Sequence, residues 1–320
     1  MGALMRVVHV APGPPGHGVV RHALALSTLQ AAAGLQTSVL RRLDPVGPAD
    51  VVHLQFSDSL LTGGVTEAAD AVRTWAGGLR APLVVTLHDV PGQDPDPARD
   101  LRRLTGYEVV RTLADAVVVS SPHELPGAGP GSLLVPLPVE PLAAAGPVPA
   151  WADRPTVGVL GFVYPGKGHA QVIEAVAQHG AGTRVVVLGA ASEGHADLLA
   201  ELRGRARELD VDLVVTGSLS EADLHAAALA VTVPVAAYRT LGASGSVAAW
   251  HACGRRPVVT DSALVRDQLR RDPDSLLLTA DLGPAVLRAL RDPVSTWLTR
   301  PVDRPDVVGR HDEIYRSVLR

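Results

Sequence analysis

The sequence of 320 residues contains a single cysteine, Cys253, and very few aromatic side chains, which make up 3% of the chain. One cysteine excludes an intramolecular disulfide and a zinc site built from cysteines. The apolar interior must therefore be built from alanine, valine and leucine rather than from aromatic rings. No run approaches the ~18 consecutive apolar residues of a bilayer-spanning helix, so we expect no transmembrane segment.

The chain also lacks an excess of charge of either sign. Its formal net charge is -4 and its pI is about 6.3, so the composition does not indicate a nucleic-acid partner. Lysine is scarce and arginine supplies most of the positive charge, which, with abundant alanine and proline, favours a GC-rich bacterial source. The first ten residues show no signal-peptide cleavage pattern, so we expect a cytoplasmic protein. Peripheral contact with a membrane stays open.

Hydrophobic residues, at 47% against 19% charged residues, are sufficient for a large buried core. Short β-branched runs alternate with longer helical stretches, as in a parallel sheet covered by helices on both faces. In the first half, strands are predicted at residues 6–10, 36–40, 50–55, 82–87, 116–120 and 133–136. Helices are predicted there at residues 19–33, 67–77 and 100–113.

The same alternation restarts after a segment rich in proline, alanine and glycine. Further strands are predicted at residues 156–160, 184–188, 213–216, 230–234, 257–260 and 275–278. Further helices are predicted at residues 170–179, 196–209, 221–228, 246–253 and 310–320. The fold class is therefore α/β, with two doubly wound, Rossmann-like domains. We place the domains at residues 1–145 and 155–304, a linker at 146–154 and a C-terminal helix at 305–320.

Ligands of open parallel sheets bind beyond the carboxyl ends of the strands, and two such domains favour a site in the cleft between them. The segment 161–168 follows a predicted strand and has the G-x-x-x-x-G-K spacing of a phosphate-binding loop. The residue after Lys167 is Gly168, so the Ser or Thr that binds magnesium in an NTPase is missing. Lys167 at a helix start still suits a phosphate. The alternative is a solvated lysine in a turn.

The segment 240–246 is a second candidate for binding a phosphate, because it leads from a strand into a helix. Small residues at a helix N-terminus leave backbone N–H groups free, and the helix dipole favours an anion there. Ser244 and Ser246 would then bind a phosphate, or they would only cap the helix.

His88 and Asp89 close the strand predicted at 82–87. A His–Asp pair at this position suits acid–base or substrate-orienting work, the alternative being a turn aspartate beside a structural histidine. In the first loop, Gly13, Gly16 and Gly18 lack the G-x-G-x-x-G spacing of a dinucleotide site.

Other histidines are scattered along the sequence: His17, His22, His53, His123, His169 and His251. No pair has the spacing and carboxylate support of a metal site, so none is predicted. Arg99, Arg102 and Arg103 form a basic cluster that we interpret as a solvated helix face.

Several motifs, each weak alone, follow one another in a fixed order. They are the Gly-rich loop and helix start at 14–24, Thr86-Leu-His-Asp89, "AD…V…S" at 114–121, G-x-x-x-x-x-K-G at 161–168, the Gly turn at 215–224 and "ACG…PVV" at 252–259. In this order they resemble the retaining glycosyltransferases of the GT-B fold, specifically family four (glycosyl transferases group 1).

The resemblance implies two Rossmann-like domains facing a cleft, an acceptor-side domain first and a nucleotide-sugar domain second, with the C-terminal helix returning toward the first. It implies transfer of a sugar from a nucleoside-diphosphate sugar to a hydroxyl acceptor, with retention and without a metal or cofactor. Lys167 would contact the diphosphate and His88 the donor sugar. The donor-binding residues that it implies are Gly16, Gly18, Gly161, Phe162, Gly217, Ser218, Leu219, Gly242, Ala243, Ser244, Gly245, Ser246 and Val247.

Two positions depart from that pattern. The family carries a Glu-x7-Glu pair whose carboxylates bind donor-sugar and ribose hydroxyls, and this chain has Leu241 and Ala249 there. An arginine common in the Lys loop is Phe162 here. Arg239 is a further donor-binding candidate that would compensate, and Arg239→Ala is expected to weaken nucleotide binding by more than about tenfold.

The missing glutamates leave other functions open. One is a degenerate, non-catalytic protein that binds a nucleotide sugar, and a second is a GT-B-fold sugar-nucleotide epimerase, although an epimerase should carry acid–base carboxylates near the nucleotide. A third, an NAD-dependent enzyme, is disfavoured by the glycine spacing. The sequence identifies neither the donor base and sugar nor the acceptor.

Overall fold

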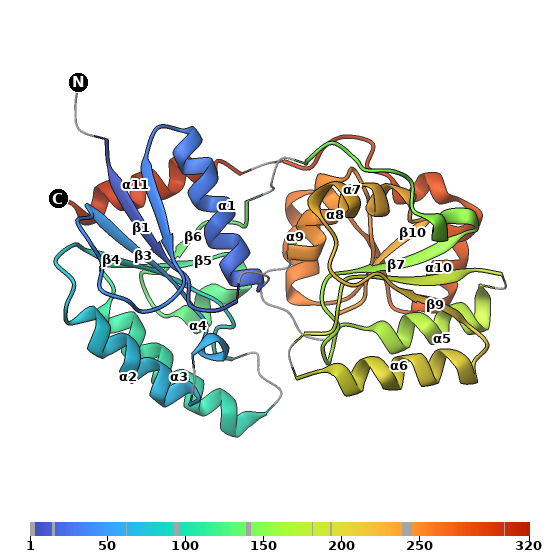
Figure 1. Cartoon of the computed structure of the whole chain (residues 1–320), viewed down its shortest axis with the longest axis horizontal. Coiled ribbons are helices and arrows are strands. Elements are labelled where there is room, and N and C mark those ends of the chain that lie inside the picture. The colour runs from blue at the N-terminus through green and yellow to red at the C-terminus, as the bar shows by residue number, and fades with distance from the viewer. Residues whose placement is uncertain are drawn as a thin grey trace. The chain divides into compact units, whose positions relative to one another are not determined.

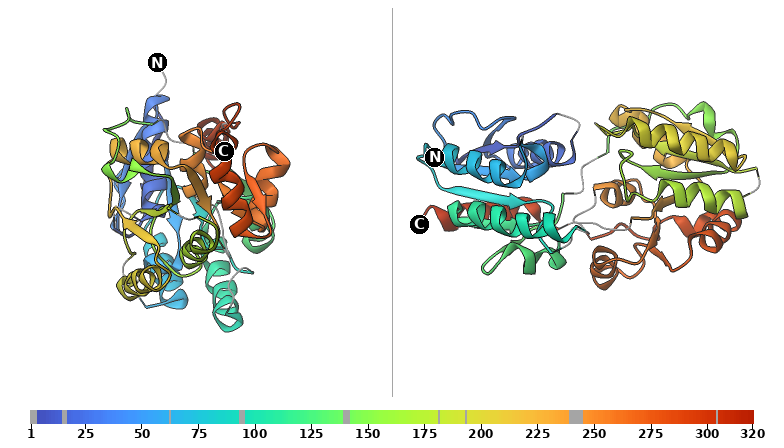
Figure 2. Two further views of the ribbon diagram at one scale, coloured as in Figure 1. Left: turned by 90° about the vertical axis from the view of Figure 1, so that its right-hand side faces the viewer. Right: turned by 90° about the horizontal axis from the view of Figure 1, so that it is seen from below.

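The computed structural model describes residues 4–14, 17–61, 63–92, 96–138, 142–180, 182–192, 194–238, 245–303 and 305–320. The chain forms two compact units: unit 1 comprises Met1–Pro138 and Arg304–Arg320, and unit 2 comprises Val139–Asp303. Each unit is a central sheet with helices on both faces (Figures 1 and 2). The segment expected to be a linker belongs to unit 2 by its contacts, and the N–H of its first residue, Gly146, donates to the Ala222 carbonyl at 2.9 Å.

The sheet of unit 1 has six parallel strands in the order β2-β1-β3-β4-β5-β6. They are β1 (Arg6–Val10), β2 (Gln36–Leu40), β3 (Val51–Phe56), β4 (Leu83–Leu87), β5 (Ala116–Val119) and β6 (Leu133–Leu134). The chain runs outward from β1 to β2 and then returns to β3 on the other side of β1. The strand order therefore reverses between β1 and β3, and the loops that follow these strands diverge there.

Helices cover both faces of this sheet (Figure 1). They are α1 (Gly18–Ala32), α2 (Val65–Ala76), α3 (Pro97–Leu113), α4 (Leu125–Ala128) and α11 (Val307–Val318), with the 3-10 turns η1 (Asp58–Leu60) and η2 (Pro122–Glu124). Val51 and Val84 pack with α1 and α11, whereas Val52 and Val85, one residue along each strand, pack with α2 and α3. This alternation buries both faces of the strands. The return of the C-terminal helix to the first unit, expected from the resemblance, is confirmed.

The sheet of unit 2 is also parallel, in the order β12-β11-β10-β7-β8-β9. Its strands are β7 (Thr156–Leu160), β8 (Arg184–Leu188), β9 (Asp212–Val215), β10 (Val233–Ala236), β11 (Val258–Thr260) and β12 (Leu277–Thr279). Its helices are η3 (Ala150–Asp153), α5 (His169–His179), α6 (Ala196–Glu208), α7 (Glu221–Ala230), α8 (Gly245–Ala252), α9 (Ala263–Arg271), α10 (Leu282–Arg291) and η4 (Pro293–Thr296). Here the strand order reverses between β7 and β10.

Besides the four-residue α4, the sequence analysis missed two longer helices, α9 and α10, and it placed β10 three residues too early. Helix α7 extends to Ala230, so β10 begins only at Val233. The missed helices carry ordinary N-terminal caps, since Ser262 Oγ accepts from the Val265 N–H and Asp281 Oδ1 accepts from the Gly283 N–H. Parallel neighbours such as β10, β11 and β12 also require crossover connections, a constraint that predicts helices in these gaps.

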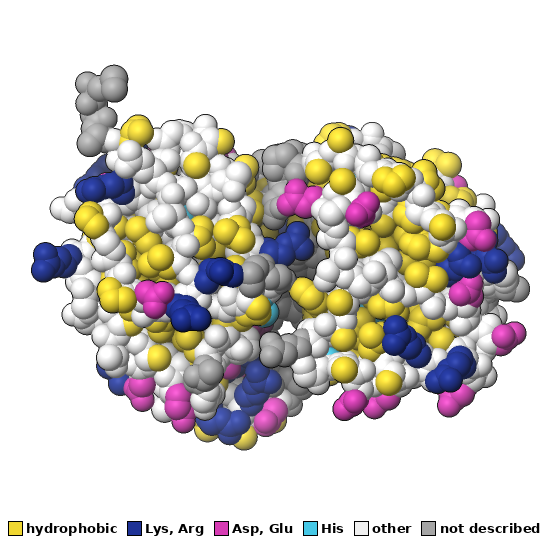
Figure 3. Space-filling model, in the orientation of Figure 1, with side chains coloured by type: hydrophobic (Ala, Val, Ile, Leu, Met, Phe, Trp, Pro, Cys, Tyr) yellow, Lys and Arg dark blue, Asp and Glu magenta, His cyan; other side chains and the backbone are white. Residues whose placement is uncertain are grey.

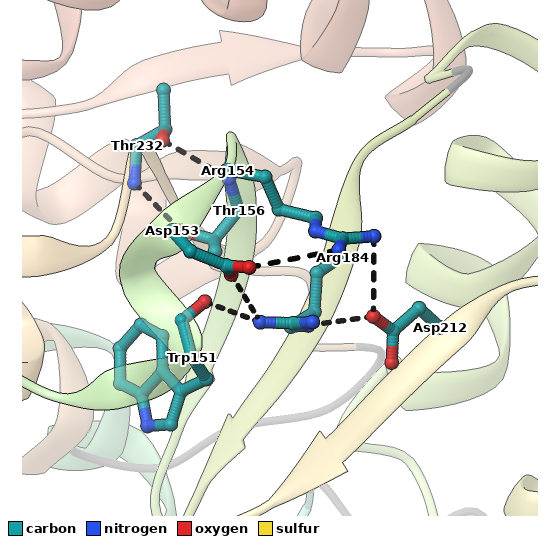
Figure 4. Close-up of polar contacts among 7 residues, drawn as sticks. All are labelled: Trp151, Asp153, Arg154, Thr156, Arg184, Asp212 and Thr232. Atoms are coloured by element: carbon teal, nitrogen blue, oxygen red, sulfur yellow. Dashed lines mark hydrogen bonds and ion pairs between the residues drawn. The ribbon is translucent and has the colours of Figure 1, made fainter.

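Ion pairs at the amino ends of the strands of unit 2 tie the sheet together (Figure 4). Arg184, the first residue of β8, donates to Asp212 Oδ2 of β9 and to Asp153 Oδ1, both at 2.7 Å, and to the Trp151 carbonyl at 2.6 Å. These carboxylates hold the pKa of the Arg184 guanidinium above its usual value. Because the pairs lie at the edge opposite the carboxyl ends of the strands, their role is structural.

Arg255, at the same edge of unit 2, is fully buried. Its guanidinium donates to three carbonyl groups at the end of α7, at 2.9 Å to Ala228, 3.2 Å to Leu229 and 2.6 Å to Val231, and lies 4.1 Å from the centre of the Trp297 ring. Burial lowers its pKa to about 10. A cation at a helix C-terminus satisfies carbonyl groups that the helix leaves without partners.

Candidate functional site

The loops after β7 and β10 meet at the point in unit 2 where the strand order reverses. The first loop ends in Lys167 and leads into α5, and the second leads into α8, whose second residue is Ser246. Lys167 Nζ donates to Ser246 Oγ at 3.1 Å, although 79 residues separate them in sequence. The structure therefore brings Lys167 of the first phosphate candidate next to Ser246, the last residue of the second.

Lys167 is a buried cation, with 4% of its surface exposed. Its Nζ lies 5.2 Å from the centre of the Tyr164 ring and 5.3 Å from that of Tyr238, so two aromatic faces flank the ammonium group. No carboxylate of the described residues forms an ion pair with it, and burial lowers its pKa to about 8. The alternative of a solvated turn lysine is therefore wrong.

Lys167 is also the only lysine among the 320 residues; all other basic side chains apart from histidine are arginine. A buried charge without a counter-charge is costly, because its lost hydration is not replaced. An ammonium group in this position is ready to bind an anion that enters from solvent. The first turn of α8, which begins at Gly245 beside it, adds backbone N–H groups that favour the same kind of ligand.

Three glycines make this arrangement sterically possible. A Cβ at Gly161, which directly follows β7 and has φ +102°, would lie 2.5 Å from Lys167 Nζ and 3.0 Å from Ser246 Oγ. A Cβ at Gly168 would lie 2.1 Å from the Ala237 carbonyl oxygen, and one at Gly189 would lie 2.3 Å from that of Gly161. Larger residues at these positions would displace the loops that hold the lysine.

His169, the first residue of α5, is a site residue to which the sequence analysis gave no role. It is 4% exposed, and its Nε2 is buried without a hydrogen-bond partner among the described residues. Burial, reinforced by the charge of Lys167, lowers its pKa to about 4, so the ring is neutral at pH 7. An orphaned polar atom next to a buried ammonium group is a further sign of a missing polar ligand.

Of the remaining donor-binding candidates of unit 2, the structure describes some and leaves others outside the described residues. Gly217 (φ +72°), exposed Ser218 and half-buried Leu219 follow β9, and half-buried Phe162 and buried Val247 lie in the loop after β7 and in α8. The others in unit 2, Arg239, Gly242, Ala243 and Ser244, lie outside the described residues, as does Gly16 of unit 1. Gly18 is the first residue of α1.

In unit 1, His88 directly follows β4 and is half-buried at the carboxyl edge of the sheet. Its Nε2 lies 3.0 Å from Oε1 of Gln55, a buried residue of β3. Its ring meets that of His22 edge-on, with 5.5 Å between centres. Burial lowers the pKa of His88 to about 4; Asp89 opposes this shift and His17 adds to it. His88 is therefore neutral at pH 7.

His88 belongs to a group of imidazoles that we call the histidine cluster: His9, His22, His53, His88 and His311. The pKa of every member lies below the ordinary value, with burial as the largest cause. The members come from β1, α1, β3, the end of β4 and α11. The interpretation of His22 and His53 as scattered is wrong, because parallel strands and the returning C-terminal helix gather them.

Asp89 and Ser57 also line the carboxyl edge of the sheet of unit 1. Asp89 has φ +55°, a conformation uncommon outside glycine, and accepts a hydrogen bond from Ser57 Oγ at 2.8 Å. Behind them, Arg103 forms an ion pair with buried Asp58 at 3.0 Å, and Tyr107 Oη donates to Asp58 Oδ1 at the same distance. Arg103 is 8% exposed, so its assignment to a solvated face is wrong.

The described residues contain no group of three or more His, Cys, Asp or Glu side chains placed to hold a metal ion. None of the described helices is long and apolar enough to cross a membrane. Basic and acidic side chains are interspersed on the visible surface of each unit (Figure 3). The chemistry available at the two sheet edges is therefore that of one buried ammonium group, helix N-termini, neutral imidazoles, hydroxyl groups and the carboxylate of Asp89.

Comparison with known proteins identifies the fold. No protein-family model matches the chain, and no curated protein matches its sequence. Among solved structures, Anabaena Alr3699/HepE in complex with UDP and glucose is similar with a TM-score of 0.71 and 15% identity, covering 98% of this chain and 100% of that one. AviGT4, a glycosyltransferase of avilamycin A biosynthesis, is similar with a TM-score of 0.63 and 16% identity, covering 98% of each chain.

An α-glucosyltransferase in complex with UDP and DNA is similar with a TM-score of 0.63 and 14% identity, covering 99% of this chain and 100% of that one. The chain has the GT-B fold. The likeness extends over nearly the whole chain, so both units take part in it. At these identities it establishes architecture, and the function has to be argued from the site.

Proposed function

We propose that this protein is a retaining glycosyltransferase that moves a sugar from a nucleoside-diphosphate sugar to a hydroxyl acceptor. The observation that carries the proposal is Lys167, a buried ammonium group without a carboxylate partner among the described residues, at the strand-order reversal of unit 2. In an α/β sheet of this kind that position is where nucleotides bind. Solved structures with the same fold are described with UDP and UDP-glucose.

The proposed donor site has three parts. Lys167 and the first turn of α8 bind the diphosphate, whose negative charge replaces the hydration that the buried lysine lacks. Ser246 Oγ, already 3.1 Å from Nζ, contacts the same phosphate. Backbone groups of the turn at residues 217–219 bind the base.

The proposed reaction breaks the bond between the anomeric carbon and the phosphate oxygen, and the electron pair leaves with the nucleoside diphosphate. Lys167 and the α8 N-terminus stabilise the charge that develops on the leaving group. The acceptor oxygen bonds to the anomeric carbon on the same face, and its proton passes to the departing phosphate oxygen. This chemistry needs neither a metal ion nor an organic cofactor, and it needs no protein nucleophile.

Unit 1 is proposed to contribute His88, whose neutral ring contacts a hydroxyl group of the donor sugar. A half-buried imidazole with a pKa of about 4 remains uncharged throughout the physiological range. It therefore exchanges hydrogen bonds with a sugar hydroxyl without adding charge. We further propose that the protein works in the cytoplasm on an acceptor other than nucleic acid.

A non-catalytic protein that binds a nucleotide sugar is the second candidate. The reason is the Glu-x7-Glu pair of the family that the chain resembles: at the one position of this pair that the structure describes, the chain has no carboxylate. Ala249 lies in α8, half-buried against the apolar cluster around Trp250 and Leu160. No ribose-binding carboxylate is present there. The other position, Leu241, lies outside the described residues.

The test is a thermal-shift screen of UDP, GDP, ADP and dTDP and their sugars, followed by donor hydrolysis and transfer assays. A glycosyltransferase is stabilised by one nucleotide and releases it from the matching sugar donor, with the same anomeric configuration in the product. Stabilisation without turnover across all donors supports the binding protein instead. Absence of any nucleotide effect would contradict both functions.

A further inference from the structure

Gln55 lies between two histidines in the interior of unit 1. It is fully buried in β3. Its Nε2 lies 3.1 Å from Nε2 of His53, and its Oε1 lies 3.0 Å from Nε2 of His88. A single side-chain amide therefore links the histidine at the centre of the sheet to the histidine at its carboxyl edge.

In this orientation of the Gln55 amide, the geometry determines which nitrogen of His88 carries its proton. An amide oxygen only accepts hydrogen bonds, so Nε2 of His88 must be the donor and its Nδ1 must hold a lone pair. An amide NH2 only donates, so Nε2 of His53 must accept, and the proton of His53 lies on Nδ1. The tautomers of the two rings are coupled through Gln55, because reversing one would require the amide to turn over.

On its His53 side the amide continues into a buried hydrogen-bond network. His53 Nδ1 lies 2.8 Å from the hydroxyl of Tyr315, which comes from α11, and this hydroxyl also accepts from Gln30 Nε2 at 3.1 Å. On its other side, His53 Nε2 lies 2.8 Å from Thr86 Oγ1. The five side chains are each at most 1% exposed, so water does not compete for these bonds.

The remaining nitrogen of His88 is available to a ligand. Nδ1 forms no hydrogen bond with any described residue, and the ring is half-buried at the sheet edge. The ring is neutral at pH 7, because burial lowers its pKa to about 4. A fixed tautomer and a neutral ring together leave one lone pair at a defined position.

We propose that Gln55 is a positioning residue that fixes His88 as its Nε2–H tautomer and so presents Nδ1 as a hydrogen-bond acceptor for a hydroxyl of the bound sugar. The role assigned to Nδ1 rests on the proposed function, whereas the tautomer is a property of the protein alone. A freely exchanging imidazole would present an acceptor only part of the time, and it would bind the hydroxyl correspondingly less well.

The direct test is nitrogen-15 NMR of protein labelled at histidine, with the signals of His88 identified by their loss in His88→Gln. We expect His88 as the Nε2–H tautomer in the wild type and as a mixture in Gln55→Leu, which keeps the volume but offers no acceptor. Gln55→Glu, which keeps an acceptor oxygen toward His88, should restore the Nε2–H form. A wild-type His88 that carries its proton on Nδ1 would overturn the proposal without any variant.

The second test uses the transfer reaction. Gln55→Leu is expected to lower kcat by about three- to tenfold, the loss of one hydrogen bond, with unchanged affinity for the nucleotide alone. Gln55→Glu should recover most of that loss. Ser27→Ala is the matched control, because it removes a different buried hydrogen bond of unit 1, 2.9 Å from Thr37 Oγ1, and should change neither kcat nor the tautomer.

The two proposals fail in different ways. If the wild-type protein transfers no sugar, the proposed function fails while the NMR experiment still decides the tautomer. If the protein is active but Gln55→Leu leaves both the tautomer and kcat unchanged, the positioning role is refuted while the proposed function stands.

Discussion

The buried ammonium group of Lys167 makes a chemical prediction that does not depend on knowing the substrate. Its pKa is lowered from 10.5 to about 8. At pH 7.5 about a quarter of the molecules then carry the free amine, against about one in a thousand for an ordinary lysine. Since a less basic amine is also a weaker nucleophile, we expect a net acceleration on the order of tenfold toward a small reagent such as cyanate.

The assay is carbamylation by cyanate across pH 6.5–10.5, followed by peptide mass spectrometry. Because the chain has no other lysine, only Lys167 and the α-amino group should react as amines. The rate constant at Lys167, calculated for cyanic acid (HNCO) as the reacting species, should rise to a plateau with a midpoint near pH 8. The same lysine in the unfolded protein should show a midpoint near 10.5, which serves as the internal reference.

Nucleotide binding should protect Lys167. At a concentration of 100 times Kd about 1% of the sites are free, so the rate should fall by about 100-fold while the α-amino group reacts as before. An anion in contact with the ammonium group also raises its pKa, because the charged form is then stabilised. The affinity for nucleotide should therefore decline as the pH rises through 8, because Lys167 of the free protein loses its charge there.

Lys167→Met keeps the side-chain length without the charge and should weaken nucleotide binding by about 10- to 150-fold, the range of a hydrogen bond to a charged group. The reasoning is refuted if the modification midpoint of the native protein lies near 10.5. It is also refuted if none of the four nucleoside diphosphates slows the reaction at Lys167.

Three further predictions follow from packing and burial. The histidine cluster should make the free energy of unfolding strongly pH-dependent, because the pKa values of its members in the folded protein lie below 6.5, the value in the unfolded chain. The contribution of these histidines to stability is therefore complete above pH 6.5 and is lost as the pH falls toward 4. For the three fully buried members, His9, His53 and His311, the loss is about 4 kcal/mol per pH unit, which denaturant titrations at several pH values should show. Gly161→Ala should displace Lys167 and weaken nucleotide binding, measured by calorimetry, by at least about tenfold. Gly194→Ala is the control and should leave binding unchanged, because Gly194 also has a positive φ but a Cβ there would meet open space. Arg255→Met should lower the free energy of unfolding by about 3 kcal/mol, because buried carbonyl groups lose their donors, with nucleotide affinity unchanged in the folded protein.

The half of the candidate site around Lys167 was largely predictable from sequence. Lys167 and Ser246 both lie where a strand leads into a helix, and in a parallel sheet such positions fall at one edge. Their contact across 79 residues is a consequence of strand order, which places β7 beside β10. The spacing of residues in the sequence does not say which strands are neighbours in the sheet. It also does not show that Lys167 is buried away from water.

The histidine cluster and Arg103 show where sequence reasoning fails. A histidine in a strand has the same sequence signature whether it packs against leucine or against another imidazole. The partner of Arg103 is Asp58, 45 positions earlier in the numbering, and only the packing of α3 beside η1 joins them. Such pairs depend on distances between elements, which periodicity does not encode.

The sequence by itself determined that the chain is α/β with two doubly wound halves, because continuous apolar strands alternating with helices can be buried in few other ways. It also made Lys167 stand out after a glycine-containing loop, since the chain has no other lysine. The tertiary structure decided which groups surround that lysine, how Gln55 orients His88, and that the C-terminal helix supplies Tyr315 to the first unit. These arrangements depend on strand order and chain return, which bring residues far apart in sequence within hydrogen-bond distance.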